Sequence, residues 1–559
     1  MNLCKHFLRL VAVFGVVGVI FTVAASPCHL RPFKAGLVCV CNSTYCDTLE
    51  FNAPRKNGSF VLVSTSEQGL RFQKKEGIFA TETVVVHDIK QKRRQRSSPN
   101  VIDSRSLIKW LMDRYTSNSQ PTTRASDTVT VKIDHSIKYQ RIVGFGGALT
   151  GSVAHLLNNM SPELRDKVLE SYFSKDTGIG YSMVRTSIGG CDFDLKPWAY
   201  NELPEHDAKL SNFTELDARD LLKVKILEKI NEIAKEEVKI MAAAWSPPKW
   251  MKTNNEWTGA SALFSEYYGT WADYHIKFLE LMKQQNVSVW AISTGNEPMN
   301  GAVFWMVVKF MSLGWAPKEQ GIWVAKHLGP KLKEKFPNVL LFAGDDQRYT
   351  FPRWFNDMKE GNPDSMKYID GLAVHWYWDM FIPPGSTIGK TKKLYPEKLI
   401  INTESCLGDK PWDHHGPVLG SWGRAMEYIT PIMQDLRYNV NGWTDWNLIL
   451  DEQGGPNYAK NYVEAPMVKN NTIDEIYKQP IFYVLGHFSR FIVPGSVRVQ
   501  STSSDKSLLV LAFERPDGLT SVILYNSHKL PVTVKLEDNK NRNQEFFLPP
   551  HSIHSLLYA

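Results

Sequence analysis

The chain has 559 residues, which is too long for one average domain, and its apolar fraction of 43% and charged fraction of 22% are typical of globular proteins. The 65 Lys and Arg residues and 58 Asp and Glu residues leave a formal charge of only +7, so the charge gives no indication of a nucleic-acid-binding protein. A mild positive charge favours adhesion to anionic membrane surfaces in an acidic compartment, where histidine is also charged.

The N-terminus has the pattern of a secretory signal peptide. Lys5 and Arg9 precede an apolar stretch from Leu10 to Val23, and small residues follow at 24 and 25. We therefore expect residues 1–25 to be a signal peptide; a signal anchor is the alternative. No later apolar run reaches the length of a membrane span. Six Asn-x-Ser/Thr sequons permit glycosylation on this route, at Asn42, Asn57, Asn159, Asn212, Asn286 and Asn470.

Four of the seven cysteines lie close together after the predicted signal peptide, at Cys28, Cys39, Cys41 and Cys46. In a secreted chain this spacing predicts two disulfides that staple a small β subdomain at residues 26–50. The alternative is a zinc site, which fits less well because Cys-x-Cys-x4-Cys is not a zinc-finger spacing and no histidine cluster is nearby. The chain shows no other metal-ligand spacing and no phosphate loop, so we expect no metal and no cofactor.

Two further segments have a β-rich texture. Residues 51–135 are irregular and β-rich, and a basic run at 92–96 followed by a Ser-rich and Pro-rich tract predicts an exposed loop at about 88–127. After residue 495 short alternating strands are expected at 507–513, 521–525, 532–536 and 553–558. This pattern predicts a β-sandwich domain.

Between residues 136 and 494 strand and helix patterns alternate. The eight candidate strands end at 144–147, 184–186, 243–245, 296–297, 343–345, 374–376, 403–404 and 443–446. Apolar stripes at helical spacing lie between some of them, at 222–233 and 271–281. Eight such strands predict an α/β fold with a (β/α)8 TIM barrel; a doubly wound open sheet is the alternative, but no Gly-rich phosphate loop opens it.

Two of the predicted strands end in a glutamate. Glu297 ends the fourth strand and Glu404 the seventh, which places the carboxylates on nearly opposite sides of the barrel mouth. A pair of carboxyls at this position is typical of glycosidases. Arg185, at the end of the second strand, is the cation expected to keep one carboxylate ionised, and Asn296 can donate to a sugar hydroxyl. Taken alone, each glutamate fits an ordinary surface or ion-paired carboxylate better than a catalytic one, and the barrel pattern reverses that preference.

Other strand ends carry residues suited to sugar binding. A carboxylate such as Asp192 can accept hydrogen bonds from two neighbouring hydroxyls, and tryptophan rings stack on the apolar face of a pyranose. We expect sugar contacts from Asp192, Trp245, Tyr377 and Trp446, although core packing is an equal alternative for each tryptophan. His375 and Trp376 are expected to support the site, and residues 345–348 are expected to form an ion-paired loop beneath it.

Several motifs resemble those of the glucosylceramidases, acid β-glucosidases of glycoside hydrolase family 30. The matching stretches lie at 39–46, 143–148, 171–180, 191–193, 245–250, 296–298, 345–348, 373–377, 442–447, 454–457, 477–480 and 486–489. The resemblance runs from about Cys28 to the C-terminus. It implies that an immunoglobulin-like β-sandwich, built from both chain ends, and a small disulfide-bonded subdomain, which includes about 448–476, flank the barrel.

The resemblance also implies roles for individual residues. Glu297 is implied as the acid/base and Glu404 as the nucleophile of a retaining mechanism. Glucose contacts are implied for Asp192, Trp245, Asn296, Trp446 and Asn461. The implied substrate is glucosylceramide, the implied partners are a saposin-type activator and an anionic lipid membrane, and the implied location is the lysosome, with secretion as the alternative. A barrel hydrolase for another β-glycoside and a non-catalytic glycan-binding or lipid-binding paralogue are the competing hypotheses.

Three features depart from the family pattern. Gly295 stands where the vertebrate enzymes usually have Glu. The loop from Met299 to Trp315, on the aglycone side, is about two residues longer and lacks the family's Tyr and Phe arrangement. The tract from about Asp88 to Asp127 is an insertion.

Overall fold

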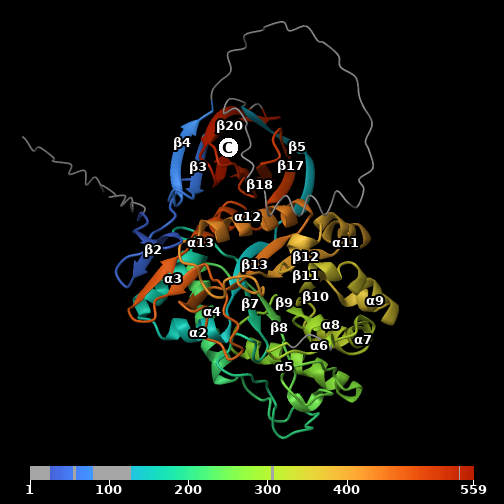
Figure 1. Cartoon of the computed structure of the whole chain (residues 1–559). Coiled ribbons are helices and arrows are strands. Elements are labelled where there is room, and N and C mark those ends of the chain that lie inside the picture. Colours follow the sequence, from blue (N-terminus) through green and yellow to red (C-terminus); the bar gives the residue numbers. More distant parts are fainter. Residues whose placement is uncertain (1–25, 55–57, 80–127, 304–307, 541) are drawn as a thin grey trace, which may run out of the picture.

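The computed structural model describes residues 26–54, 58–79, 128–303, 308–540 and 542–559 (Figure 1). The expected signal peptide and the expected basic loop lie outside these residues. The described strands form a closed barrel, a nine-stranded sheet and a five-stranded sheet. None of the helices in these ranges is long and apolar enough to cross a membrane.

Eight parallel strands close the barrel, which confirms the (β/α)8 prediction. In chain order they are β6 (Gly144–Ala148), β7 (Met183–Ser187), β8 (Lys239–Ala243), β9 (Ala291–Ser293), β10 (Leu340–Gln347), β11 (Gly371–His375), β12 (Leu399–Glu404) and β13 (Gly442–Asn447). Most of their residues are buried because helices cover the outside and side chains fill the interior. One interior layer is apolar and contains Met183, Met241, Ala291, Phe342, Ala373 and Ile401.

The outer helices pack on the barrel through apolar stripes. Trp271, Tyr274, Phe278 and Leu281 are all buried on α5, as the helical spacing predicted. The helices are α2 (Gly151–Asn158), α3 (Pro162–Phe173), α4 (Ala218–Ala234), α5 (Tyr268–Gln284), α6 (Pro298–Ala302), α7 (Pro317–Trp323), α8 (Gly329–Lys335), α9 (Arg353–Gly361), α10 (Ser365–Tyr368), α11 (Ile388–Leu394), α12 (Trp422–Arg437) and α13 (Pro480–Ser489).

The fourth barrel strand is shorter than the sequence predicted. β9 ends at Ser293, so the expectation that Glu297 ends this strand is wrong. Glu297 follows four residues later in a left-handed conformation, with φ of 44°, and is the N-cap residue of α6. A left-handed residue turns the chain away from the strand direction, and here it begins a short helix at the barrel mouth. Glu297 therefore owes its orientation to a turn.

The nine-stranded sheet is built from both ends of the chain. Its order is β21-β20-β5-β17-β18-β19-β22-β3-β4. Phe60 on β3 contacts Phe546 on β21, near the opposite edge, at 5.3 Å between ring centroids, so the sheet folds over a shared core into two layers. The strands are β3 (Ser59–Ser66), β4 (Gln73–Ile78), β5 (Val129–Arg141), β17 (Val497–Ser503), β18 (Leu508–Glu514), β19 (Thr520–Asn526), β20 (Val532–Asp538), β21 (Arg542–Leu548) and β22 (Ser552–Tyr558).

The strands β3, β4 and β5 were predicted only as part of a β-rich segment, and among the strands after residue 495 two were not predicted, β17 and β21. Their sequences, VRVQSTS and RNQEFFL, carry few apolar residues and alternate only weakly. Helices α12 and α13 lie between this sheet and the barrel (Figure 1).

The five-stranded sheet carries both predicted disulfides. Its order is β1-β2-β16-β15-β14, and the pairs are Cys28–Cys39 and Cys41–Cys46. Cys28–Cys39 links the residues before β1 to β2, and Cys41–Cys46 links β2 to the residues that follow it. The strands are β1 (Leu30–Phe33), β2 (Gly36–Asn42), β14 (Ile449–Asp451), β15 (Met467–Lys469) and β16 (Glu475–Lys478).

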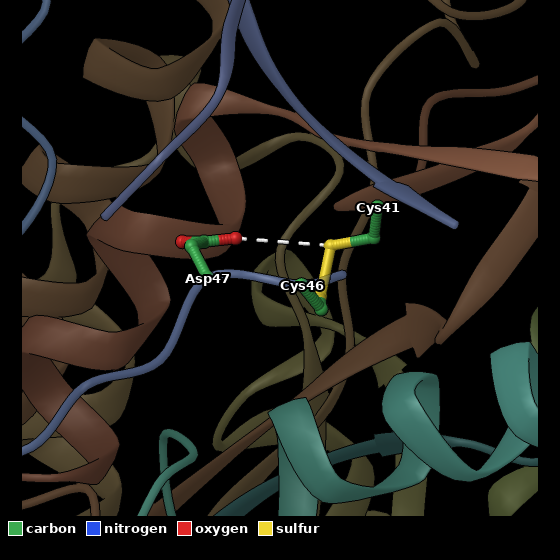
Figure 2. Close-up of side chains that lie close together, drawn as sticks. All are labelled: Cys41, Cys46 and Asp47. Atoms are coloured by element: carbon green, nitrogen blue, oxygen red, sulfur yellow. Dashed lines mark hydrogen bonds between the residues drawn. A yellow bond between two sulfur atoms is a disulfide. The ribbon is translucent and has the colours of Figure 1, made fainter. Parts of the chain in front are cut away.

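Asp47 approaches the second disulfide (Figure 2), with 3.8 Å between Cys41 Sγ and Asp47 Oδ1. A disulfide sulfur has no proton to donate and no thiolate to offer a metal, so this group is not a metal site. The carboxylate is instead satisfied by Lys478 Nζ at 3.0 Å and by the Tyr483 hydroxyl at 2.7 Å. These contacts join the disulfide-bonded segment to the chain at β16 and α13.

Candidate active site

Glu297 and Glu404 meet at the mouth of the barrel. One carboxylate oxygen of each and one ring nitrogen of His375 all lie within 4.8 Å of one another. The two glutamates are only 7% and 6% exposed. The strand count predicted that the two side chains face each other across the barrel mouth, and in the structure their carboxylates lie close together there.

Glu404, the last residue of β12, has a donor on each carboxylate oxygen. Arg185 Nη1 lies 2.5 Å from Oε2, and the Tyr377 hydroxyl donates to Oε1 at 2.6 Å. Burial raises the pKa of Glu404, while the charges of His375 and Arg185 and the Tyr377 hydrogen bond act in the opposite direction. Arg185 thus lies where the sequence predicted a cation. Tyr377, expected as a sugar contact, donates to the carboxylate.

Glu297 accepts three hydrogen bonds. Gln347 Nε2 and His375 Nδ1 lie 2.8 Å and 3.1 Å from Oε1. Asn300 Nδ2 lies 2.5 Å from Oε2. The backbone N–H of Glu297 donates to the carbonyl of Asp345 at 2.9 Å, which fixes the turn to the neighbouring strand β10. The carboxylate is therefore held from three sides.

A buried charge network lies beneath the pair. Asp345, a left-handed residue near the end of β10, accepts hydrogen bonds from His375 Nε2 at 3.1 Å, Thr403 Oγ1 at 2.7 Å and Arg185 Nη2 at 3.0 Å. Burial alone lowers the pKa of His375, but Glu404, Asp345 and Glu297 outweigh it and raise the pKa to about 10. His375 is therefore an imidazolium that donates to a carboxylate from each nitrogen. Although Asp345 is buried, Arg185 and His375 hold its pKa well below its usual range.

Glu297, His375 and Glu404 approach one another as closely as metal ligands would. Both imidazole nitrogens face carboxylates, however, and Arg185 lies against Glu404. Two protein cations thus already balance the charge of these carboxylates.

Aromatic rings cover Arg185. Trp245 and Trp446 stack at 5.6 Å between centroids, and the guanidinium carbon lies 4.9 Å and 5.5 Å from their ring centres. Asn296 Oδ1 accepts from Arg185 Nη2 at 2.7 Å, which brings the residue before Glu297 into the same group. Trp376 lies to one side, where its Nε1 donates to the carbonyl of Cys406 at 2.9 Å, so it supports the wall of the site.

Asp192 is buried and incompletely satisfied. Its Oδ2 accepts a long hydrogen bond of 3.4 Å from Asn461 Nδ2, and its Oδ1 has no partner. Burial raises the pKa of Asp192 well above its usual value, and the nearby charges of Glu404 and Glu297 add to the shift. A buried carboxylate oxygen without a donor is costly, and a ligand hydroxyl would satisfy it.

The residues of the expected ion-paired loop at 345–348 make two different sets of contacts. Asp345 and Gln347 contact Glu297, as described above. Asp346 Oδ2 accepts the backbone N–H of Met299 at 2.9 Å, and Arg348 pairs with Asp379 and Asp435 at 3.0 Å and 3.3 Å. Sequence reasoning did not identify Gln347 or Asn300 as partners of Glu297, because both depend on the left-handed turns at 297 and 345.

Comparisons with known proteins give one family for both of the matched domains. The glycosyl hydrolase family 30 TIM-barrel domain matches residues 142–492, and the glycosyl hydrolase family 30 β-sandwich domain matches residues 495–556. Lysosomal acid glucosylceramidase of Mus musculus is 32% identical over 98% of this chain and 99% of its own length. Putative glucosylceramidase 3 of Caenorhabditis elegans is 33% identical over 93% and 92%. The crystal structure of SrfJ from Salmonella typhimurium superimposes with a TM-score of 0.73 at 25% identity, over 89% of this chain and 99% of SrfJ.

Proposed function

The chain belongs to glycosyl hydrolase family 30, and from this membership we propose that it is a retaining β-glucosidase that hydrolyses glucosylceramide to glucose and ceramide. The observation that carries the proposal is the approach of Glu297 and Glu404. Retaining glycosidases hold two carboxyls about 5–5.5 Å apart, whereas inverting enzymes leave room for a water molecule between them. Carboxylate oxygens that lie within 4.8 Å support the retaining alternative.

In the proposed mechanism Glu404 attacks the anomeric carbon while Glu297 protonates the departing glycosidic oxygen. The C–O bond to the ceramide breaks, and a glucosyl ester forms on Glu404. Water then attacks the same carbon, gives its proton to Glu297 and releases glucose with Glu404 as the leaving carboxylate. Arg185 and Tyr377 favour the ionised nucleophile because each donates to one of its oxygens.

The glucose ring would lie among the unsatisfied and aromatic groups of the site. Asp192 Oδ1 has room for a donor and would bind ring hydroxyls together with Asn461 and Asn296. Trp245 and Trp446 would bound the sugar with their rings.

Exposed apolar side chains beside the site support a lipid substrate. Met380 and Phe381, after β11, are both 55% exposed, and Trp412, after β12, is 58% exposed. The rings of Trp378, Phe381 and Trp412 cluster at 6.0–6.5 Å, only a few residues along the chain from Tyr377 and Glu404. The exposed lysines at 390 and 393 follow on α11. On this basis we propose that ceramide, an anionic membrane and a saposin-type activator meet this face, in the lysosomal lumen or after secretion.

The first experiment assigns the nucleophile. A cyclitol epoxide should form an ester on Glu404 in the wild type and none in Glu404→Gln, read by peptide mass spectrometry. Glu266→Gln, which removes an exposed glutamate elsewhere on the barrel, serves as the control. Equal labelling of wild type and Glu404→Gln would show that another residue is the nucleophile.

The second experiment tests the substrate. Purified protein is given glucosylceramide with and without saposin and anionic lipid, beside a panel of aryl β-glycosides. We expect glucosylceramide turnover that falls strongly when lipid and activator are omitted. Turnover of another β-glycoside but not of glucosylceramide would refute the assignment of glucosylceramide as substrate. No turnover of any glycoside would refute the assignment of the protein as a glycosidase.

A further inference from the structure

Asn300 contacts Glu297 from within the same short helix. Its Nδ2 lies 2.5 Å from Glu297 Oε2, and its backbone N–H donates to the Glu297 carbonyl at 2.9 Å. Asp346 accepts the backbone N–H of the intervening Met299 at 2.9 Å. The turn that orients Glu297 therefore also fixes the position of the Asn300 amide.

The donors on Glu297 are distributed unequally. Oε1 accepts from Gln347 and from the positively charged His375, so both of its in-plane lone pairs are occupied. Among the residues that the structure describes, Oε2 has a single donor, the Asn300 amide. When Glu297 takes up a proton, the proton must therefore sit on Oε2, beside Asn300.

An asparagine amide can serve both states of this oxygen. Its NH2 donates to an ionised carboxylate, and its carbonyl accepts from a carboxylic acid. A half-turn of the amide about χ2 exchanges the two ends. His375 cannot make the same exchange, because it is protonated and its other nitrogen is bound to Asp345. Gln347 donates to the other oxygen, Oε1, and so does not contact Oε2.

We infer that Asn300 is a positioning residue for Glu297: its amide keeps Oε2 as the proton-carrying oxygen and orients it in both the acid and the base form. The inference rests on the proposed function, because it takes Glu297 to be the acid/base. Asn300 touches no reacting atom in this assignment and acts only through Glu297.

The test uses leaving groups that need different amounts of protonation. A dinitrophenyl β-glucoside leaves as a stable anion without a proton, whereas an alkyl β-glucoside requires general acid catalysis. Since kcat/KM reports the first chemical step, we compare it for both substrates in wild type and in Asn300→Leu, which keeps the approximate shape and removes both hydrogen-bonding ends.

We expect Asn300→Leu to lower kcat/KM for the alkyl glucoside by about 10-fold or more, the size of one hydrogen bond to a charged group, and for the dinitrophenyl glucoside by less than about 2-fold. Asn300→Gln should restore most of the alkyl activity. Met299→Leu is the matched control, because it changes a half-buried neighbour on the same helix that donates no side-chain bond to Glu297.

Equal losses on both substrates, or no loss on either, would overturn the inference. If Asn300→Leu fails to fold, Asn300→Ala removes both hydrogen-bonding ends without adding bulk and should show the same selective loss. Failure of the proposed function is distinguishable, since wild type would then hydrolyse neither glucoside, or Glu404→Gln would leave both activities intact.

Discussion

Replacing Tyr377 with phenylalanine removes one of the two donors on the proposed nucleophile. The hydroxyl lies 2.6 Å from Glu404 Oε1, and both residues are less than 10% exposed. A hydrogen bond to a charged group contributes about 1.5–3 kcal/mol, which corresponds to a factor of roughly 10 to 100 in an equilibrium. The bond stabilises the ionised carboxylate, so its loss raises the pKa of Glu404.

The expected result is a displaced acidic limb in the profile of kcat/KM against pH. The proposed mechanism needs ionised Glu404. At the acidic end, kcat/KM of Tyr377→Phe should therefore be about 10-fold below that of wild type, and near the plateau the difference should be smaller. A fluorogenic β-glucoside assayed from pH 4 to 8 measures the limb, and thermal unfolding checks that the fold is retained.

Tyr428→Phe is the matched control for this prediction. Its hydroxyl is also buried and donates to a carboxylate, Asp445 Oδ1 at 3.0 Å, but it does not contact Glu404. The control should leave the acidic limb unchanged. If the limb of a folded Tyr377→Phe coincides with that of wild type, the hydroxyl does not tune Glu404 and the reasoning is refuted.

Three further variants test buried ionisable side chains. Arg185→Met leaves Asp345 and Glu404 without their shared cation and should cost about 3–5 kcal/mol, measured as a lower unfolding temperature and soluble yield; an unchanged melting curve would contradict this. His375→Gln removes the positive charge that lowers the pKa of Glu404, so it should displace the acidic limb of kcat/KM toward higher pH, and an unmoved limb would contradict this. Its stability deficit should shrink as pH rises from 6.5 toward 10. His554 is fully buried, and burial lowers its pKa to about 3, so the wild type should lose stability as pH falls below about 6.5. Denaturant titrations at pH 7 and pH 5 should show a smaller loss of unfolding free energy for His554→Gln than for the wild type. Equal losses in the two proteins would contradict this.

The barrel could be predicted because its signals are local. Each strand is a short apolar run, and the residue types at the C-terminal ends of β7, β11, β12 and β13 change abruptly to Arg, His, Glu and Trp. Strand order then follows from the parallel βα repeat, so the convergence of Arg185, His375 and Glu404 needed no structure.

The partners of Glu297 could not be predicted in the same way. A strand ending at 297 would give the side chain an alternating direction, but β9 ends at Ser293 and a positive φ at Glu297 redirects the chain. Positive φ at a non-glycine residue has no reliable sequence signal, so the contact with Asn300 three residues later was not foreseen. Tyr377 was assigned to the sugar for a related reason: its residue type suits both roles, and only geometry distinguishes them.

The pairing of β22 with β3 affects how the protein is made. Ser64 and His554 are in contact although they lie 490 residues apart, and β22 separates β3 from β19 within the sheet. At translation rates of about 5–20 residues per second, β3 waits roughly 25–100 s for its neighbour. During that time β3 and β4 pair with no strand of the sheet other than each other, and contacts this distant in sequence close slowly. A chain that ends before β22 would leave β3 and β19 as two open edges, and we expect quality control to recognise them before any defect in the barrel.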